Sequence, residues 1–247
     1  MLTAQYADPY ALSAEFYDVL CEQQWLQRRG PIAQMLQEVD PSGVILDIGA
    51  GTGPCVQVIA DALPKARILA VEPSAAMRAA LVGRIMRSSD LRQRVTVLAG
   101  TLDQVTLPPR LAAAVICGTI GYLDAPQRHQ LWQQLAERLD ERGIVIVDVM
   151  MLKAPQTVPL MQAANTSIGE HTYHVALHGE PAGGDLMHWT LDYQVRAGDQ
   201  VIRRFQADHH WHTFGLEQVA EEAGAAGFVL EPLGDALIPA AVLRKRS

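Results

Sequence analysis

A glycine-rich turn near residue 50 joins an apolar stretch to a helix-forming segment. Val44–Ile48 is a short and nearly continuous apolar run, typical of a parallel strand covered on both faces. Glycines follow at alternate positions, Gly49, Gly51 and Gly53, and Pro54 begins a helical pattern. Glycine permits a tight turn and lets a ligand approach the backbone, while the helix N-terminus offers free N–H donors. The pattern predicts a site for a nucleotide-type ligand.

Two acidic residues at strand ends could complete this site. Asp47 stands two positions before the first glycine, and Glu72 ends the next predicted strand. An acidic side chain at that second position can accept hydrogen bonds from both hydroxyls of a ribose. Taken alone, Glu72 is more simply explained as a solvated residue at a helix start. Together with the glycine turn, it is predicted to bind a ribose.

Two ligand classes use such a turn. Dinucleotides need G-x-G-x-x-G, whose last glycine packs the helix on the strand, and Pro54 occupies that position here. Pro54 in place of that glycine counts against dinucleotide binding, so an NAD(P)-dependent oxidoreductase is the alternative and not the main hypothesis. The G-x-G-x-G spacing preceded by Asp47 resembles the first motif of class I methyltransferases, which implies S-adenosyl-L-methionine as the cofactor. A protein that keeps this fold only for binding, or for other chemistry, is a third possibility.

The composition limits the partners and the compartment. The chain has 247 residues, 49% hydrophobic and 19% charged, as in a globular protein with a large core. Its formal net charge of −7 repels a phosphate backbone, so nucleic acid is not an expected partner. The three cysteines are scattered, which favours a reducing compartment. Residues 1–13 lack an apolar leader and no apolar run has membrane length, so we expect a cytoplasmic protein with no membrane partner.

Strand and helix patterns alternate up to Asp148, which predicts an α/β fold with a Rossmann-like doubly wound sheet. The sheet should be mostly parallel with an antiparallel last strand, and an antiparallel β appendage should span about 165–212. The expected helices are 11–20, 25–39, 54–62, 74–86, 126–139 and 216–226. The expected strands are 44–48, 67–71, 95–98, 113–117, 143–148, 165–178, 186–197, 200–212, 228–233 and 237–243.

The whole chain resembles small-molecule N-methyltransferases that dimethylate amino groups on nucleotide-activated sugars. Phe16-Tyr17-Asp18 is similar to their Y-D segment, and the run from Cys117 to Leu123 is similar to their loop after the fourth strand. Asp208–Phe214 matches the end of their extra antiparallel layer. The resemblance implies one domain over 1–247. Its parts would be a helical cap (1–42), a cofactor-binding core (43–150), an acceptor-covering insertion (160–212) and a closing segment (213–247).

The resemblance also implies site residues. Tyr17 would lie over the cofactor, Cys117 and Gly118 would border the transferred methyl group, and Tyr122 replaces a histidine of those enzymes. In Gly100-Thr101-Leu102-Asp103, the Leu102 backbone would pair with the adenine ring, Thr101 stands where an acidic residue is usual, and a role for Asp103 is left open. The predicted cofactor-binding set is Asp47, Gly49, Ala50, Gly51, Gly53, Glu72, Pro73, Thr101, Leu102, Cys117 and Gly118.

The candidate catalytic residues are Tyr17, Tyr122 and His210. A hydroxyl acceptor needs a base within hydrogen-bond reach, whereas an amine must be neutral when it attacks. His209, His210 and His212 lack further residues at ligand spacing, so we expect no metal, and a general base among them is a minority option. The expected function is methyl transfer to a small amine or hydroxyl in secondary metabolism, with N-methylation slightly favoured. The expected partners are this acceptor and, through free strand edges, a second copy in a homodimer.

Overall fold

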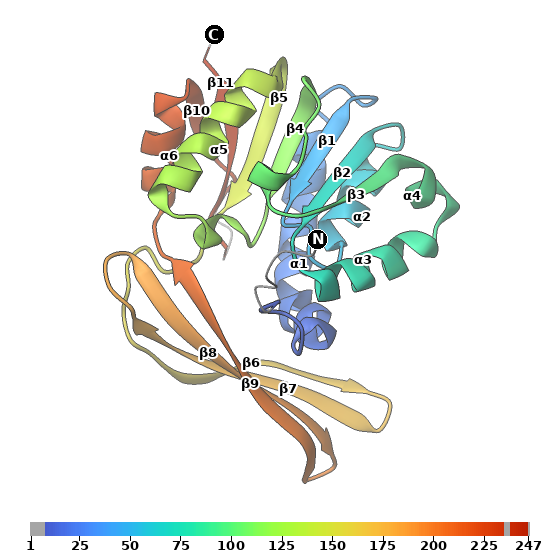
Figure 1. Ribbon diagram of the computed structural model, residues 1–247, viewed down its shortest axis with the longest axis vertical. Coiled ribbons are helices and arrows are strands. Elements are labelled where there is room, and N and C mark those ends of the chain that lie inside the picture. The colour runs from blue at the N-terminus through green and yellow to red at the C-terminus, as the bar shows by residue number, and fades with distance from the viewer. Residues whose placement is uncertain (1–7, 235–237, 247) are drawn as a thin grey trace, which may run out of the picture.

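A computed structural model describes residues 8–234 and 238–246 of the chain. Two sheets make up the fold, one above the other in Figure 1. The larger has seven strands in the order β10-β11-β5-β4-β1-β2-β3, and the smaller has four in the order β6-β7-β8-β9. β11 runs antiparallel to both of its neighbours, while the pairs from β5 to β3 are parallel. The predicted α/β architecture with an antiparallel appendage is confirmed.

The strands of the larger sheet are β1 (Val44–Ile48), β2 (Arg67–Glu72), β3 (Val95–Ala99), β4 (Leu111–Ile116), β5 (Leu139–Asp148), β10 (Phe228–Pro232) and β11 (Ala240–Lys245). Those of the smaller sheet are β6 (Val158–Ile168), β7 (His171–Pro181), β8 (Leu186–Ala197) and β9 (Gln200–His212). The α-helices are α1 (Ala14–Leu36), α2 (Pro54–Ala62), α3 (Ala75–Met86), α4 (Ser89–Arg94), α5 (Ala125–Arg138) and α6 (Leu216–Ala225), and two 3₁₀ turns are η1 (Leu102–Gln104) and η2 (Ile120–Tyr122).

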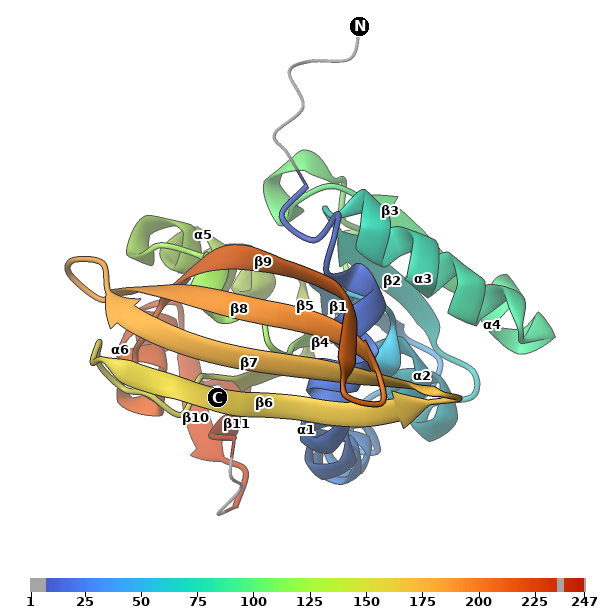
Figure 2. The same cartoon turned by 90° about the horizontal axis from the view of Figure 1, so that it is seen from below.

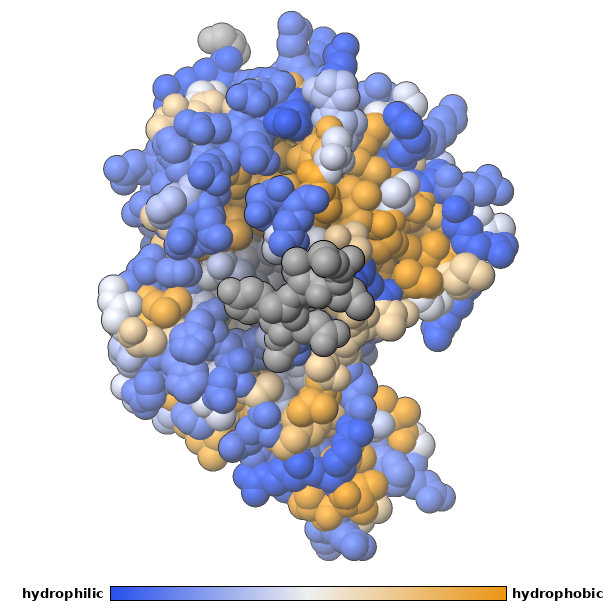
Figure 3. Space-filling view, viewed as in Figure 1, coloured by the Kyte–Doolittle hydropathy of each residue, from blue (hydrophilic) through white to orange (hydrophobic). Residues whose placement is uncertain are grey.

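Helices cover both faces of the larger sheet, and a buried apolar cluster fills each interface. Side chains of α1, α2 and α3 form one cluster, and those of α5 and α6 form the other. β3 lies at the edge, where its side chains are mostly half-buried or exposed, and Figure 3 shows hydrophobic residues gathered on the β2 and β3 side. β1 lies at the centre of the sheet: the chain adds β2 and β3 on one side of it and then returns to add β4 and β5 on the other side. Ligands of open α/β sheets bind at the carboxyl ends of the strands at such a point.

One continuous helix replaces the two predicted before residue 40. α1 runs through Pro31, which removes one backbone donor from the helix. Gly30 precedes the proline, and the clash with a preceding Cβ is therefore absent. Ile32 and Leu36, beyond the proline, are buried against α2 and the sheet. Tertiary packing thus outweighs the local break at Gly30-Pro31, and the predicted interruption between residues 20 and 25 is wrong.

The appendage has four strands instead of three. The predicted strand 165–178 is divided by a tight turn, in which Ile168 pairs with His171 and Gly169 has a φ of +62°. Glycine reaches this left-handed conformation at little cost, which explains a hairpin without an Asn-Gly or Asp-Gly signal. Elsewhere α4 was not predicted, and β5 begins at Leu139 instead of residue 143.

The inner face of the appendage packs on the N-terminal helix, as the view in Figure 2 shows. Phe16 of α1 is fully buried, with the rings of Tyr173, Tyr193 and Phe205 around it at centroid distances of 5.1–5.6 Å. Side chains alternate between the two faces of a strand. Every second residue of β9 counted from Phe205 therefore faces α1 and the larger sheet.

Candidate functional site

The glycine turn after β1 adopts the conformation that only glycine tolerates well. Gly49, Gly51 and Gly53 have φ angles of +73°, +56° and +91°. The N–H groups of Gly49 and Ala50 donate to the carbonyl oxygen of Val71 at 2.9 and 3.0 Å, which ties the turn to β2. A Cβ built on Gly49 would lie 2.1 Å from Oγ1 of Thr119. At Gly49 the turn is therefore packed against the loop after β4 and leaves no room for a side chain.

Glu72 joins the end of β2 to this turn. One carboxylate oxygen accepts the N–H of Gly51 at 2.8 Å, and the other accepts the N–H of Ser74 at 2.8 Å. The side chain is buried, and burial raises the pKa of its carboxyl, an effect that the two backbone donors oppose. Each oxygen keeps a second lone pair. Glu72 and the glycine turn are thus in direct contact.

Asp47 lies under the turn and is 1% exposed. Burial raises the pKa of its carboxyl to about 7, although a hydrogen bond with Cys55 acts in the opposite direction. Its Oδ2 has no hydrogen-bond partner among residues 8–234 and 238–246. A buried polar atom without a partner is uncommon and is often completed by a ligand. This atom fits a site that receives a cationic group from a ligand.

The raised pKa of Asp47 has a consequence for stability. The folded state binds this proton more tightly than the unfolded state, whose ordinary value is 3.8. The free energy of unfolding of the ligand-free protein should therefore decrease as the pH rises from about 4 to about 8. Urea denaturation over this pH range measures the slope. Asp47→Asn should remove much of it, and an equal slope in both proteins would assign the proton to another group.

Arg28 and Asp148 form a buried ion pair that the sequence did not reveal. Nε of Arg28 lies 2.6 Å from Oδ2 of Asp148, and the two side chains are 11% and 4% exposed. Oδ1 of Asp148 accepts the N–H of Gly118 at 2.7 Å. The guanidinium lies over Trp25 at 5.4 Å, and its Nη2 is 3.7 Å from a Cβ built on Gly118. Arg28 lies among polar residues of the helix, so its sequence surroundings give no signal of burial.

Tyrosines border the same region. The ring of Tyr17 is 3.4 Å from a Cβ built on Gly51, and the hydroxyl of Tyr122 hydrogen-bonds to that of Tyr10. The neighbouring Cys21 and burial raise the pKa of Tyr17 well above its ordinary value, and burial raises the pKa of Tyr122 to about 12. Both hydroxyls are therefore protonated at neutral pH. Tyr10 was missed, because nothing in its polar N-terminal segment indicates where it packs.

His210 does not face this region, which corrects its place among the catalytic candidates. Its ring stacks on His188 at 5.0 Å, on the outer face of the appendage. His209 faces inward instead, with its ring 5.1 Å from that of Tyr10. Burial lowers the pKa of His209, which keeps its imidazole neutral near pH 7. The register of β9 decides between the two, and the sequence alone does not give that register.

The predicted adenine segment lies beside Glu72, because the N–H of Gly100 donates to the Glu72 carbonyl oxygen at 3.4 Å. Thr101 and Asp103 are exposed and bonded to each other, with 2.5 Å between Oγ1 and Oδ1. The half-buried Leu102 packs against the cluster on the α5 side of the sheet. Pro73 is exposed, Cys117 is buried, and Gly118 is held by Asp148. These residues surround the carboxyl ends of β1, β2 and β4.

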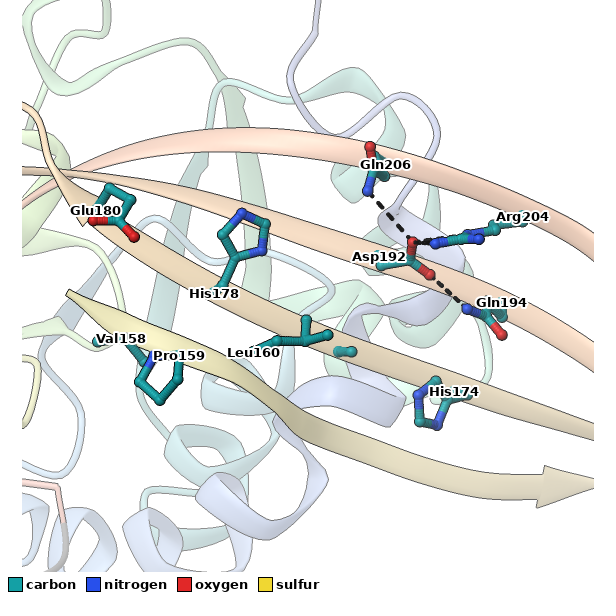
Figure 4. A pocket seen from close by; sticks show the side chains of 11 residues that line it. Val158, Pro159, Leu160, His174, His178, Glu180, Asp192, Gln194, Arg204 and Gln206 are labelled. Carbon is teal, nitrogen blue, oxygen red and sulfur yellow. Dashed lines mark hydrogen bonds and ion pairs between the residues drawn. The ribbon is translucent and has the colours of Figure 1, made fainter.

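A separate hollow of about 520 Å³ lies on the outer face of the appendage. Asp192 binds Arg204, Gln194 and Gln206 on its floor, as Figure 4 shows. None of the predicted site residues lines it. Within the described ranges, no three or more His, Cys, Asp or Glu residues are placed to hold a metal ion. None of the helices described here is long and apolar enough to cross a membrane.

Part of the chain matches a known family, and the whole chain is similar in fold to solved structures. Residues 45–143 match the family model described as "Methyltransferase domain". No curated protein matches the chain. Among solved structures, the chain resembles the sugar N-methyltransferase KedS8 from Streptoalloteichus sp ATCC 53650, with 19% identity, a TM-score of 0.75, and 99% and 97% of the two chains covered.

Two further structures have the same fold. DesVI of Streptomyces venezuelae is 19% identical, with a TM-score of 0.76 and coverage of 98% and 99%. CalS10 of Micromonospora echinaspora, an amino pentose methyltransferase, is 16% identical, with a TM-score of 0.74 and coverage of 98% and 99%. Residues 45–143 therefore match a methyltransferase domain, and the whole chain shares the fold of these solved structures. The methyltransferase domain predicted from the glycine turn is confirmed over these residues.

Proposed function

We propose that the chain transfers a methyl group from S-adenosylmethionine to the amino group of a small molecule. The observation that carries the proposal is the direct bond between Glu72 and the N–H of Gly51, which brings two separate predicted motifs into contact at the carboxyl ends of β1 and β2. One fold neighbour is a sugar N-methyltransferase and another is an amino pentose methyltransferase, and this supports an amine acceptor. A hydroxyl acceptor is the second candidate within the same class.

The residues around the turn fit the cofactor. Glu72 would hold the ribose hydroxyls, the partnerless Oδ2 of Asp47 suits the ammonium end, and Arg28 with the N-terminus of α2 suits the carboxylate. Leu102 and Thr101 would flank the adenine. The other predicted members, Gly49, Ala50, Gly53, Pro73, Cys117 and Gly118, would shape the pocket.

When bound, the cofactor supplies a methyl group on a sulfonium sulfur. A nucleophile would attack the methyl carbon in line with the carbon–sulfur bond, and the sulfur would leave as a thioether. The chain then has to orient the acceptor, exclude water and take up a proton. Tyr17 and Tyr122, protonated at neutral pH, can orient an amine by hydrogen bonds but cannot act as bases. His209 is neutral and faces inward, and we assign to it the role first given to His210.

Isothermal titration calorimetry and a transfer assay test this function. The full chain should bind S-adenosylhomocysteine with a dissociation constant in the micromolar range or below, and should not bind NAD. Incubation with labelled S-adenosylmethionine and a panel of amino sugars and aryl amines should place label on nitrogen. Binding of NAD alone would restore the dehydrogenase alternative, and binding without transfer to any acceptor would favour a protein that only binds the cofactor.

Glu72→Ala should weaken S-adenosylhomocysteine binding at least tenfold. The substitution removes charge-assisted hydrogen bonds worth roughly 1.5–3 kcal/mol each. It also releases the N–H of Gly51. Calorimetry measures the effect, with Glu231→Ala as a control because that exposed carboxylate pairs only with Arg244, on the β10–β11 hairpin. An unchanged dissociation constant for Glu72→Ala would exclude its ribose role.

The division of the chain, its compartment and its assembly complete the proposal. We assign cofactor binding to residues 43–150 and the covering of the acceptor to residues 160–212. Both belong to one domain, which the cap 1–42 and the segment 213–247 complete.

The buried thiols of Cys21, Cys55 and Cys117 are free, which supports a location in the reducing cytoplasm. β6 and β9 are the outer strands of their sheet and leave edges for a homodimer. Light scattering after gel filtration gives the mass that decides between monomer and dimer.

A further inference from the structure

Four aromatic rings meet on one side of the proposed site: Tyr10, Tyr122, His209 and Trp211, here called the aromatic wall. The centroid of the Tyr10 ring is 5.1 Å from that of His209, and the Tyr10 and Tyr122 hydroxyls share a hydrogen bond. The Tyr122 ring meets Trp211 edge to face at 4.6 Å. One ring precedes α1, one lies in η2 and two come from β9. Three distant parts of the chain therefore build a single surface.

The aromatic wall adjoins the glycine turn. The ring of Tyr10 meets that of Tyr17 edge to face at 6.0 Å, and Tyr17 in turn lies against Gly51. Trp211 packs so closely on Gly121 that a Cβ there would lie 1.9 Å from the indole Nε1. The loop after β4 thus carries a glycine where the indole needs the space. An acceptor that reaches the reacting methyl group has to pass or touch these rings.

Phosphate groups are bound in proteins mainly by arginine or lysine side chains and by free N–H groups of helix N-termini. Three arginines contact the predicted cofactor residues: Arg78 and Arg84 are bound to protein oxygens, and Arg28 pairs with Asp148 and is assigned to the carboxylate of the cofactor. The pairs are Arg28 with Asp148 at 2.6 Å, Arg78 with the carbonyl oxygens of Glu72 and Pro73 at 2.8 and 2.6 Å, and Arg84 with Asp18 at 2.7 Å and the carbonyl oxygen of Thr52 at 2.9 Å. The residues outside the described ranges, 1–7, 235–237 and 247, include no lysine or arginine.

The N-terminus of α3, which the segment before Tyr10 contacts, is also occupied. A carboxylate oxygen of Asp8 accepts the N–H of Ala76 at 3.1 Å and the hydroxyl of Ser74 at 2.9 Å, and Ser74 caps Met77. Asp8 and Tyr10 belong to the same short segment. The hydrogen bonds of Asp8 to Ser74 and Ala76 therefore hold this segment in place and also occupy the N–H groups at the N-terminus of α3. A phosphate would have to displace this carboxylate. Its negative charge would also meet Glu72 close by.

Resting on the proposed function, we propose that the acceptor is an amine without a phosphate group, and that its ring or its ammonium binds on the aromatic wall. Aromatic faces attract organic cations and cover apolar rings, and neither interaction needs a charged side chain. A methylated amine remains a cation when protonated, so substrate and product suit the same surface. The chain's net charge of −7 favours a cationic partner over an anionic one. The nucleotide-linked acceptors that the sequence resemblance implies do not fit this side of the site.

Calorimetry on the full chain saturated with S-adenosylhomocysteine tests the proposal with two probes that share one amino sugar. One probe is its phenyl glycoside and the other is its thymidine diphosphate conjugate. The phenyl glycoside should bind at least tenfold more tightly. Equal or tighter binding of the diphosphate probe, or no binding of the phenyl glycoside, overturns the proposal. Because saturation with S-adenosylhomocysteine is measured first, a failure of the proposed function is recognised separately at that step.

Variants of the wall give the second arm of the test. Tyr10→Ala should weaken phenyl glycoside binding about tenfold, whereas Tyr10→Phe, which keeps the ring, should stay within about threefold of wild type. Trp211→Ala should act like Tyr10→Ala. The affinity for S-adenosylhomocysteine in Tyr10→Phe shows that the cofactor pocket is intact. Unchanged acceptor binding in Tyr10→Ala removes the aromatic wall from acceptor recognition.

Discussion

Gly51→Val should abolish detectable binding of S-adenosylhomocysteine, a loss of at least a hundredfold. The φ of +56° at this position costs about 1–2 kcal/mol for a residue with a Cβ, and more for a β-branched one. The new Cβ would lie 3.4 Å from the ring of Tyr17, and the two methyl groups would extend into the space where the ligand has to approach the backbone. Backbone strain and steric exclusion of the ligand therefore act together at Gly51.

Gly198→Val separates the two effects. Gly198 has the same φ of +56°, lies in the turn between β8 and β9, and a Cβ there has no neighbour within 4 Å. The two variants should lose similar free energy of unfolding in urea, since they carry the same backbone strain. Only Gly51→Val should lose the ligand in calorimetry. Retained binding in Gly51→Val would show that the site lies elsewhere, and a loss in both variants would attribute the effect to backbone strain and not to exclusion of the ligand.

The convergence of the residues proposed to hold the cofactor could be predicted because its signals are local. An apolar run, three alternating glycines and an acidic residue at the next strand end all follow from chain geometry within about 25 residues. The structure joins them through the Glu72–Gly51 bond. Parallel strands end at one edge of a sheet, so the residues after them converge without any further information.

The acceptor side could not be predicted, because it depends on contacts between distant segments. Tyr10 takes its place when Asp8 docks on Ser74, 66 positions away. Whether His209 or His210 faces inward depends on the register of β9, and a shift of one residue exchanges the faces. The hairpin at Gly169 moved no site residue, but it shows the same limit, since one glycine divided a predicted strand. On the acceptor side, the local sequence pattern indicates candidate residues, but the packing of distant segments determines which of them face the site.

Arg28→Met should lower the free energy of unfolding by about 3–5 kcal/mol near pH 7. The substitution leaves the carboxylate of Asp148 buried without its counter-ion, and one backbone N–H from Gly118 does not replace it. Arg110→Met is the matched control, since Arg110 is 80% exposed in its ion pair with Asp140 and an exposed pair is worth at most about 1 kcal/mol. Urea denaturation measures both. A loss below about 1 kcal/mol in Arg28→Met would mean that water or another donor satisfies Asp148.

The pH dependence of this loss follows from the same pair. Burial already raises the pKa of Asp148, and Arg28 opposes that effect. In Arg28→Met the folded-state pKa rises further, so the variant binds the proton more tightly when folded than when unfolded. Its stability is therefore greatest at low pH and is lost as the pH rises through the folded-state pKa. The difference from wild type should shrink towards pH 4, and a difference that is constant with pH would attribute the loss to packing.

Adding Asp148→Asn to Arg28→Met should restore most of the stability, because no charge remains buried and the amide oxygen still accepts the N–H of Gly118. The affinity for S-adenosylhomocysteine should not recover, because the guanidinium proposed to bind its carboxylate is still absent. Calorimetry on the double variant thus separates the two roles of Arg28. If stability and affinity recover together, Arg28 acts only by holding Asp148 and the loop at Gly118 in place, and the carboxylate of the cofactor is held by the N-terminus of α2 alone.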